Sequence, residues 1–400
     1  VVDGRLKDFL GAATVEGELG AKLPLAMAAG PGGAKGPGED ALDLKSTLTA
    51  SAAGFSLADV ALSFERGGRP QIVTGSVSGQ WRQSLAVEAV FGSRWLDLDQ
   101  IGGQQKLAIG DLAQTIADRL GWILPKAARA SVRLAVDQAT VGGDILSQII
   151  LALDRSADTI TLRELRATMP GGSRVDVRGL VRLDSGRPTR FDGEATVRGS
   201  SLARFLSWSL GAAAPELRRD SAFGLRGKLS IESGAVLVND MMAELAGIAM
   251  SGSVTYRHDG RRQLALALEG SEIDTASLPV GTLGIEALLG CLAPRLASAS
   301  ARPAGPSTGA GVAAVDFVAR LNVGRLILAE RQFRDVVADV SREAGRLRIG
   351  TLRFATDEGL SVEMQGEVGG LDKHAKGTLT GLLALDGSRS IELLLGAIEL

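Results

Sequence analysis

The fold is decided by a stretch that runs from Ile231 to Leu278, IESGAVLVNDMMAELAGIAMSGSVTYRHDGRRQLALALEGSEIDTASL. Its aliphatic runs alternate apolar and polar residues and are separated by glycine-containing turns, which is the pattern of half-buried β-strands. Similar stretches begin at Phe55 and Ile160, and a fourth, GRLRIGTLRFATDEGLSVEMQGEVGG, begins at Gly345. Such internal similarity predicts an array of β units, each of which buries its face against the next.

The four copies align on one glycine each, namely Gly75, Gly179, Gly252 and Gly366. We call these the anchor glycines. We expect glycines in such strands to mark turns, bulges and places where one backbone passes close to another. The anchor glycines are unevenly spaced, which indicates that segments of variable length are inserted between similar cores.

The inserted segments have helical periodicity. In GDLAQTIADRLGWILP, Leu112, Ile116 and Leu120 recur at helical spacing between a capping aspartate and a terminating proline. Similar segments follow the second and third copies. We therefore expect short helical inserts near residues 110–124, 201–219 and 281–297.

The predicted organisation is a set of repeating β units over residues 1–300, a Gly/Pro/Ser/Ala-rich linker at 298–313 and a further β unit over 314–400. Open sheets seldom exceed about 10 strands without curling or splitting. The predicted fold class is therefore mainly β, an elongated, curled antiparallel sheet of repeating β-groove or solenoid-like form with short helical inserts between units. Because the chain begins without Met and ends in the apolar run IELLLGAIEL, we expect a fragment that is truncated at its C-terminus.

Composition excludes several functional classes. The formal net charge is only -2 and charges of both signs are interspersed, so the chain has no electrostatic footprint for nucleic acid. Aromatic residues make up 4% of the chain, which argues against stacking platforms for bases or sugars. No apolar run reaches the roughly 18 residues of a membrane span, and no signal peptide is visible.

Candidate catalytic residues are scarce. His258 and His374 both lie in polar turn sequence without metal-ligand spacing, and Cys291 lies in an apolar run where a buried structural thiol is expected. We therefore predict no catalytic residue, no metal site and no cofactor. The pair Asp97 and Asp99 in WLDLDQI is expected to share the solvent face of a strand, because residues two apart on a strand point the same way.

Each predicted strand has an aliphatic face, which must be covered by protein or filled by an apolar ligand. Both readings stay open at this stage. The candidate lipid-groove residues are Leu225, Leu229, Ile231, Met250, Val254, Leu264, Leu266, Leu268, Leu360, Val362 and Met364.

Several motifs resemble the AsmA family of bacterial envelope proteins. They are WLDLDQI, which ends the first copy, the passage RATMPGGSRVDVRGLVRLDSGRPTRFDGEATVRGSSLARFLSW, and FGLRGKLSIESGAVLVNDMMAELAGIAMSGSVTYR followed by LALALEGSEIDTASLP. The second and third copies end in SSLARFL and EIDTASL, whereas the family has an LDLD-type motif at the end of the unit. The resemblance implies a periplasmic protein with repeating β units that form a long apolar groove. It also implies an inner-membrane anchor, an N-terminal helix absent from this chain. The family has no enzymatic site to transfer.

Larger relatives are thought to carry phospholipid between membranes, so the resemblance implies a non-enzymatic protein that binds phospholipid or another acyl lipid. Transfer between inner and outer membrane would support outer-membrane biogenesis. The alternative is a structural assembly factor for outer-membrane proteins that acts through protein contacts and has a closed protein core. No protein partner can be inferred from the sequence.

Overall fold

The structure is a computed structural model in which the chain forms two compact units, unit 1 with residues 1–197 and 229–233 and unit 2 with residues 198–228 and 234–400. Most of the described backbone is β-strand, which confirms the mainly β, open antiparallel fold expected from the alternation. The described residues are 2–7, 13–24, 41–66, 69–81, 84–101, 128–141, 143–182, 190–210, 219–232, 234–257, 263–274, 316–328, 331–369 and 376–386.

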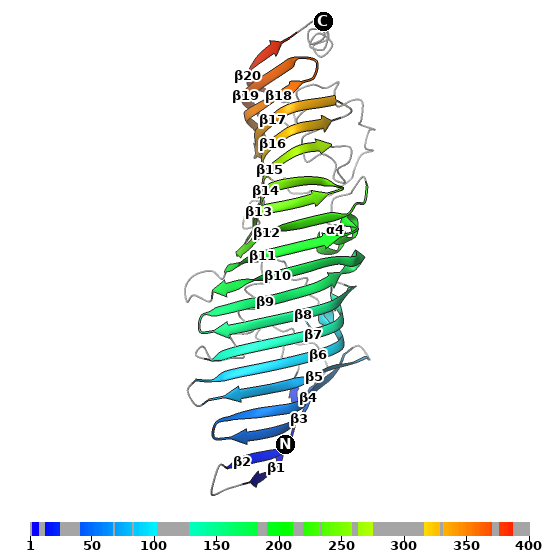
Figure 1. Cartoon of the computed structure of the whole chain (residues 1–400), viewed down its shortest axis with the longest axis vertical. Coiled ribbons are helices and arrows are strands. Elements are labelled where there is room, and N and C mark those ends of the chain that lie inside the picture. Colours follow the sequence, from blue (N-terminus) through cyan, green and yellow to red (C-terminus); the bar gives the residue numbers. More distant parts are fainter. Residues whose placement is uncertain are drawn as a thin grey trace. The chain divides into compact units, whose positions relative to one another are not determined.

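In unit 1, successive strands of the chain pair with each other, as Figure 1 shows. The elements are β1 (Val2–Lys7), β2 (Thr14–Pro24), β3 (Ala41–Ser51), β4 (Gly54–Arg66), β5 (Arg69–Gln80), β6 (Ala86–Asp97), α2 (Leu98–Ile101), β7 (Arg129–Val141), β8 (Asp144–Ser156), β9 (Thr159–Met169), the 3-10 turn η1 (Pro170–Gly172), β10 (Ser173–Arg182) and β11 (Arg190–Gly199).

Unit 2 is built in the same way, with β13 to β20 paired in chain order. Its elements are α4 (Leu202–Leu210), β12 (Phe223–Glu232), β13 (Ala235–Leu245), β14 (Ile248–Arg257), β15 (Gln263–Asp274), β16 (Asp316–Leu328), β17 (Arg331–Glu343), β18 (Arg346–Thr356), β19 (Leu360–Gly369) and β20 (Lys376–Leu385). The second half of β12, residues 229–232, belongs to unit 1.

Two junctions depart from the antiparallel order. β6 pairs with β7 in parallel, and β15 pairs with β16 in parallel. Parallel neighbours need a connection of about a dozen residues or more, because the chain must return to the end at which it started. The predicted inserts near 110–124 and 281–297, and the predicted linker at 298–313, fall in these two connections and lie outside the described residues.

Helix α4 lies within the second predicted insert, 201–219. Ser201 provides its N-cap, because its Oγ accepts a hydrogen bond of 3.2 Å from the backbone N–H of Arg204. The ring of Phe205 packs against that of Phe223 at the start of β12, with 5.1 Å between ring centroids. The helix is therefore held at both its cap and its apolar side.

The strands β7–β10 and β16–β19 repeat one structure at an offset of 187 residues. Val136 of unit 1 corresponds to Val323 of unit 2 at this offset (323 − 136), and both side chains are buried. The offset also links Gln148 to Asp335 (335 − 148), which have φ values of 53° and 51° at bulges in β8 and β17. The anchor glycines Gly179 and Gly366 are separated by the same interval (366 − 179). The repeat is thus conserved strand by strand, which the glycine alignment alone did not reveal.

The four anchor glycines lie inside strands and not at turns. Each pairs with a residue that borders a bulge on the preceding strand, and an added Cβ on each would meet a carbonyl oxygen of the following strand. Close backbone approach therefore explains the glycine. The anchor glycines and their partners are Gly75 with Val60, Gly179 with Leu162, Gly252 with Met241, and Gly366 with Ile349.

Candidate functional site

One side of β14–β20 is a largely apolar surface, which we call the apolar face of unit 2. Residues paired directly across a ladder point to the same side of the sheet, so the register identifies the members of this face. One row across the strands is Val254, Leu266, Ala319, Val340, Ile349, Gly366 and Leu379. The next row is Gly252, Leu268, Leu321, Ala338, Leu352, Met364 and Gly381.

Most of the predicted groove residues lie on this face. Leu225 is half-buried on β12 in unit 2, whereas Leu229 and Ile231 lie in the part of β12 that belongs to unit 1. The predicted residues that the register and strand alternation place on the apolar face of unit 2 are Met250, Val254, Leu264, Leu266, Leu268, Leu360, Val362 and Met364.

The centre of the face comes from strands that contributed no predicted groove residue. Val323, Val340 and Ile349 on β16–β18 are 1%, 1% and 2% exposed and anchor two apolar clusters. The signal for them was present, because VARLNV and VVADV alternate in the same way as the chosen strands. A bulge in β17 shifts the alternation of apolar and polar residues, so the pattern is not continuous along the strand.

Exposure changes across the face. Its centre is buried, but its β20 members Leu379, Leu383 and Leu385 are 44%, 51% and 39% exposed. Within the described residues, β20 pairs only with β19. The apolar face of unit 2 is therefore packed in the middle and open along β20.

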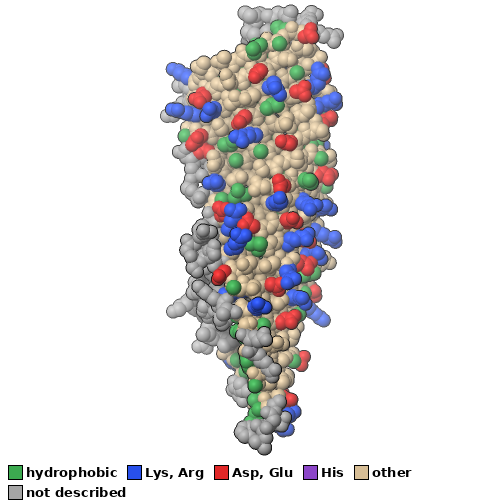
Figure 2. Space-filling view, turned by 60° about the vertical axis from the view of Figure 1, so that its left-hand side comes forward, with side chains coloured by type: hydrophobic (Ala, Val, Ile, Leu, Met, Phe, Trp, Pro, Cys, Tyr) green, Lys and Arg blue, Asp and Glu red, His purple; other side chains and the backbone are tan. Residues whose placement is uncertain are grey.

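The opposite side of the sheet is charged. Figure 2 shows Lys or Arg side chains interspersed with Asp or Glu side chains. Three ion pairs of unit 2 join directly opposed residues of neighbouring strands, namely Arg320–Asp339, Arg325–Glu272 and Arg348–Glu367. Their side chains are about half exposed or more, so each pair contributes at most about 1 kcal/mol. These pairs link neighbouring strands across the solvent-exposed polar face.

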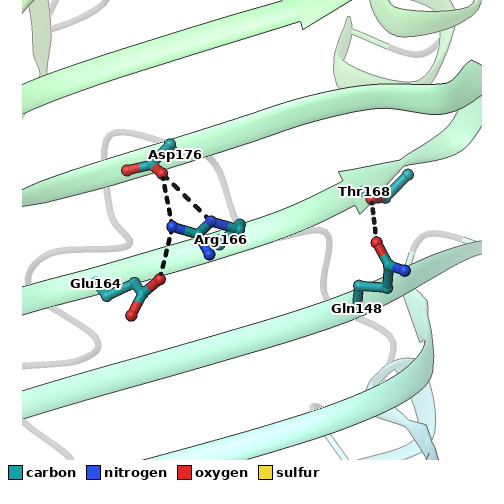
Figure 3. Close-up of polar contacts among 5 residues, drawn as sticks. All are labelled: Gln148, Glu164, Arg166, Thr168 and Asp176. Atoms are coloured by element: carbon teal, nitrogen blue, oxygen red, sulfur yellow. Dashed lines mark hydrogen bonds and ion pairs between the residues drawn. The ribbon is translucent and has the colours of Figure 1, made fainter.

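Figure 3 shows this arrangement in unit 1. Arg166 of β9 lies between Glu164, at 2.9 Å from Nη2, and Asp176 of β10, at 3.4 Å from Nε. Nearby, the Thr168 hydroxyl donates a hydrogen bond of 3.4 Å to the Gln148 side-chain oxygen. The Arg166–Asp176 and Thr168–Gln148 contacts join neighbouring strands, whereas the Arg166–Glu164 pair lies within β9.

A second polar network in unit 1 has perturbed acidity. The Ser230 hydroxyl donates to Asp192 Oδ1 at 2.5 Å, and Arg190 reaches both Asp192 and Glu232 at 2.8 Å. Burial raises the pKa of the Asp192 carboxyl, but the hydrogen bonds from Ser230 and Arg190 and the positive charge of Arg190 outweigh it, so the pKa lies below its ordinary value. The hydrogen bond to Asp192 in turn raises the pKa of Arg190.

The prediction that Asp97 and Asp99 share a strand face is wrong. β6 ends at Asp97, and Asp99 lies in the helical turn α2. The Asp99 carboxylate accepts a hydrogen bond of 2.8 Å from the backbone N–H of Gly143 in the β7–β8 turn. This bond draws the chain out of the strand, and Leu98 becomes 40% exposed while Leu96 stays buried.

The described residues offer little for catalysis. No group of three or more His, Cys, Asp or Glu side chains within them could hold a metal ion. The residues considered from the sequence, His258, His374 and Cys291, lie outside the described ranges. No helix in the described part of the chain combines the length and hydrophobicity needed to cross a membrane.

The chain matches no protein-family model, no curated protein and no solved structure in the three comparisons. The resemblance to the AsmA family therefore stays a prediction drawn from the quoted motifs.

Proposed function

We propose that this chain is a non-enzymatic, AsmA-like lipid-handling protein of the bacterial envelope, anchored at the inner membrane on its periplasmic side. The observation that carries the proposal is the apolar face of unit 2, whose leucines remain exposed along β20. Transfer of an acyl chain through water costs about 0.8 kcal/mol per CH₂ group. A face of this kind would lower that cost while head groups stay in water.

Two adjacent leucines on β20 provide a matched test. Leu383 pairs with Val362 on the apolar face, whereas Leu382 pairs with Glu363 on the polar face. Both are exposed, at 51% and 69%, so Asp at either position should leave folding intact. We expect native mass spectrometry of detergent-free protein to show bound lipid in the parent and in Leu382→Asp, and markedly less lipid in Leu383→Asp.

Lipid bound equally by both variants would place the binding surface elsewhere. Lipid absent from the parent protein, after purification from envelope fractions without detergent, would refute the proposal. Extraction and mass analysis of the released material identify the lipid class in the same experiment.

One observation favours the second candidate, an assembly factor that acts through protein contacts. The centre of the apolar face is nearly fully buried at Val323, Val340 and Ile349, as a self-packed core would be. For such a protein the parent would carry no lipid, and Leu383→Asp would leave outer-membrane protein assembly unchanged in cells that depend on this chain.

A further inference from the structure

Strand β20 of unit 2 has an outer edge that pairs with no described strand. Its neighbour within the described residues is β19, and every residue of β20 is exposed. The backbone N–H of Asp386, directly after β20, donates a hydrogen bond of 2.9 Å to the carbonyl oxygen of Gly359, on the β19 side. Opposed residues of antiparallel strands alternate between bonded and non-bonded pairs, and the register of β19 with β20 is unbroken. The odd-numbered residues of β20 therefore direct their N–H and C=O groups toward the outer edge.

This strand lacks the features that protect sheet edges from other chains. Natural edge strands are kept short or carry charges, prolines or bulges, because an open edge otherwise pairs with a further strand. The first strand, β1, has six residues and carries a charge at every second position, namely at Asp3, Arg5 and Lys7. β20 has ten residues, no bulge in its ladder, and no charge or proline between Lys376 and Asp386. β20 is therefore open to pairing with another strand.

The sequence of β20 is complementary to itself about Gly381. A two-fold axis through Gly381, perpendicular to the sheet, pairs residues that lie equally far from it. Leu379 and Leu383 lie two residues on either side (381 − 379 and 383 − 381), so they oppose each other on the apolar side. Lys376 and Asp386 lie five residues on either side (381 − 376 and 386 − 381), so they oppose each other on the polar side. Opposed leucines and opposed opposite charges both stabilise an antiparallel pair.

The backbone pattern agrees with this register. Leu379, Gly381 and Leu383 are odd-numbered, so each of them exchanges both backbone hydrogen bonds with its opposed residue across the axis. Lys376 and Asp386 are even-numbered and form a non-bonded pair, in which opposed side chains lie closer together. Side chains and backbone therefore favour the same pairing of two β20 strands.

We propose that two copies of this chain associate through β20, which pairs antiparallel with β20 of the second copy about Gly381. Leu379, which is 44% exposed in one copy, then lies beside Leu383 of the second copy. Because the axis is perpendicular to the sheet, the apolar faces of the two copies join on one side. The inference goes beyond the proposed function and does not require bound lipid.

Sedimentation velocity of the full 400-residue chain, in low salt and without detergent, tests the pairing. We expect a monomer–dimer equilibrium that depends on protein concentration. Lys376→Glu puts like charges opposite each other at both ends of the pairing and should weaken the dimer about tenfold. Asp386→Lys should weaken it by a similar factor. The variant that combines both changes restores opposite charges and should recover the affinity of the parent protein.

The matched control is Lys22→Glu in unit 1. Lys22 is exposed and lies directly opposite Asp43 within the chain's own β2–β3 pair, with 3.9 Å between the charged atoms. Its charge reversal should leave the dimer affinity unchanged. Circular dichroism checks that all variants, which change exposed residues, keep the strand content of the parent.

A disulfide reports the register directly in a Cys291→Ser background. Opposed residues of a non-bonded antiparallel pair lie within the distance that a disulfide spans. A mixture of Lys376→Cys and Asp386→Cys proteins should therefore form a covalent dimer on mild oxidation. Either protein alone should form little, because the register opposes each position to the other and not to itself.

Several results would overturn the inference. A monomer at every concentration would leave the β20 edge to another segment or another protein. Equal weakening by Lys376→Glu and Lys22→Glu would show a general charge effect, and a dimer that Lys376→Glu leaves unchanged would lie on another surface. A combined variant that stays weak, or equal cross-linking in a single-cysteine protein, would contradict the register about Gly381. The proposed function would stand in each case, because lipid binding is measured separately.

Discussion

Gly252 in β14 lies so close to β15 that the carbonyl oxygen of Ala267 occupies the space into which a Cβ on Gly252 would project. The backbone of Gly252 also has φ of +148°, a conformation that L side chains rarely adopt. Gly366 shows the same two features, with φ of +153° and a carbonyl oxygen of Thr378 in the corresponding place. The anchor glycines that identify the repeat in the sequence are therefore explained by close approach of neighbouring strands.

The substitution Gly252→Ala should destabilise unit 2 by about 2–4 kcal/mol, because it combines backbone strain with overpacking against the next strand. The matched control is Gly350→Ala, where the nearest atom to an added Cβ lies 3.6 Å away, and its effect should stay within about 1 kcal/mol. Urea unfolding followed by circular dichroism measures both. Equal effects of the two variants would contradict the close-approach explanation.

The cost of truncating an apolar side chain in unit 2 should depend on whether that side chain is buried. Ile349→Ala, at 2% exposure, should cost about 2–5 kcal/mol because it leaves a cavity in the packed centre. Leu382→Ala, at 69% exposure on the polar side of β20, should cost no more than about 0.5 kcal/mol. The same unfolding measurement applies, and a small effect at Ile349 would indicate that the centre is loosely packed.

Acid should weaken unit 1 partly through Asp192. Its pKa in the folded protein lies below the ordinary value of 3.8, so its contribution to stability is complete above about pH 4 and is lost as the pH falls through the folded pKa. Asp192→Asn should therefore show a smaller loss of unfolding free energy between pH 6 and pH 3 than the parent. Ser230→Ala, which removes one hydrogen bond to the carboxylate, should show an intermediate loss. A larger loss of unfolding free energy in Asp192→Asn than in the parent would contradict the lowered pKa of Asp192.

The N-terminus of α4 should depend on its cap. Ser201 Oγ accepts from the N–H of Arg204 and donates to Asp220 Oδ2 at 2.6 Å. Ser201→Ala should destabilise the helix by about 1 kcal/mol, whereas Ser201→Thr should keep most of the capping energy. Hydrogen exchange at the amide of Arg204 measures the effect locally. Unchanged protection in Ser201→Ala would show that packing of Phe205 on Phe223 holds the helix alone.

The strand alternation made much of the fold and part of the candidate site predictable. Leu264, Leu266 and Leu268 share a face because side chains two apart on a strand point the same way, and this holds whatever strand lies beside them. The mainly β class and the aliphatic character of each strand face follow from this local rule. Helix α4 was also predicted, as a short helical insert near residues 201–219 that follows the second copy.

Cross-strand register and the parallel junctions were decided by tertiary structure. The pairing that sets Arg342 between Phe317 and Leu347 depends on three strands and on bulges that shift the alternation, and no single-strand pattern contains that information. The departure of Asp99 from the strand likewise depends on Gly143, which is 44 residues away in the chain. The alternation of apolar and polar residues therefore determined which side chains of one strand share a face. Backbone hydrogen bonds between strands decided which residues of neighbouring strands lie beside them.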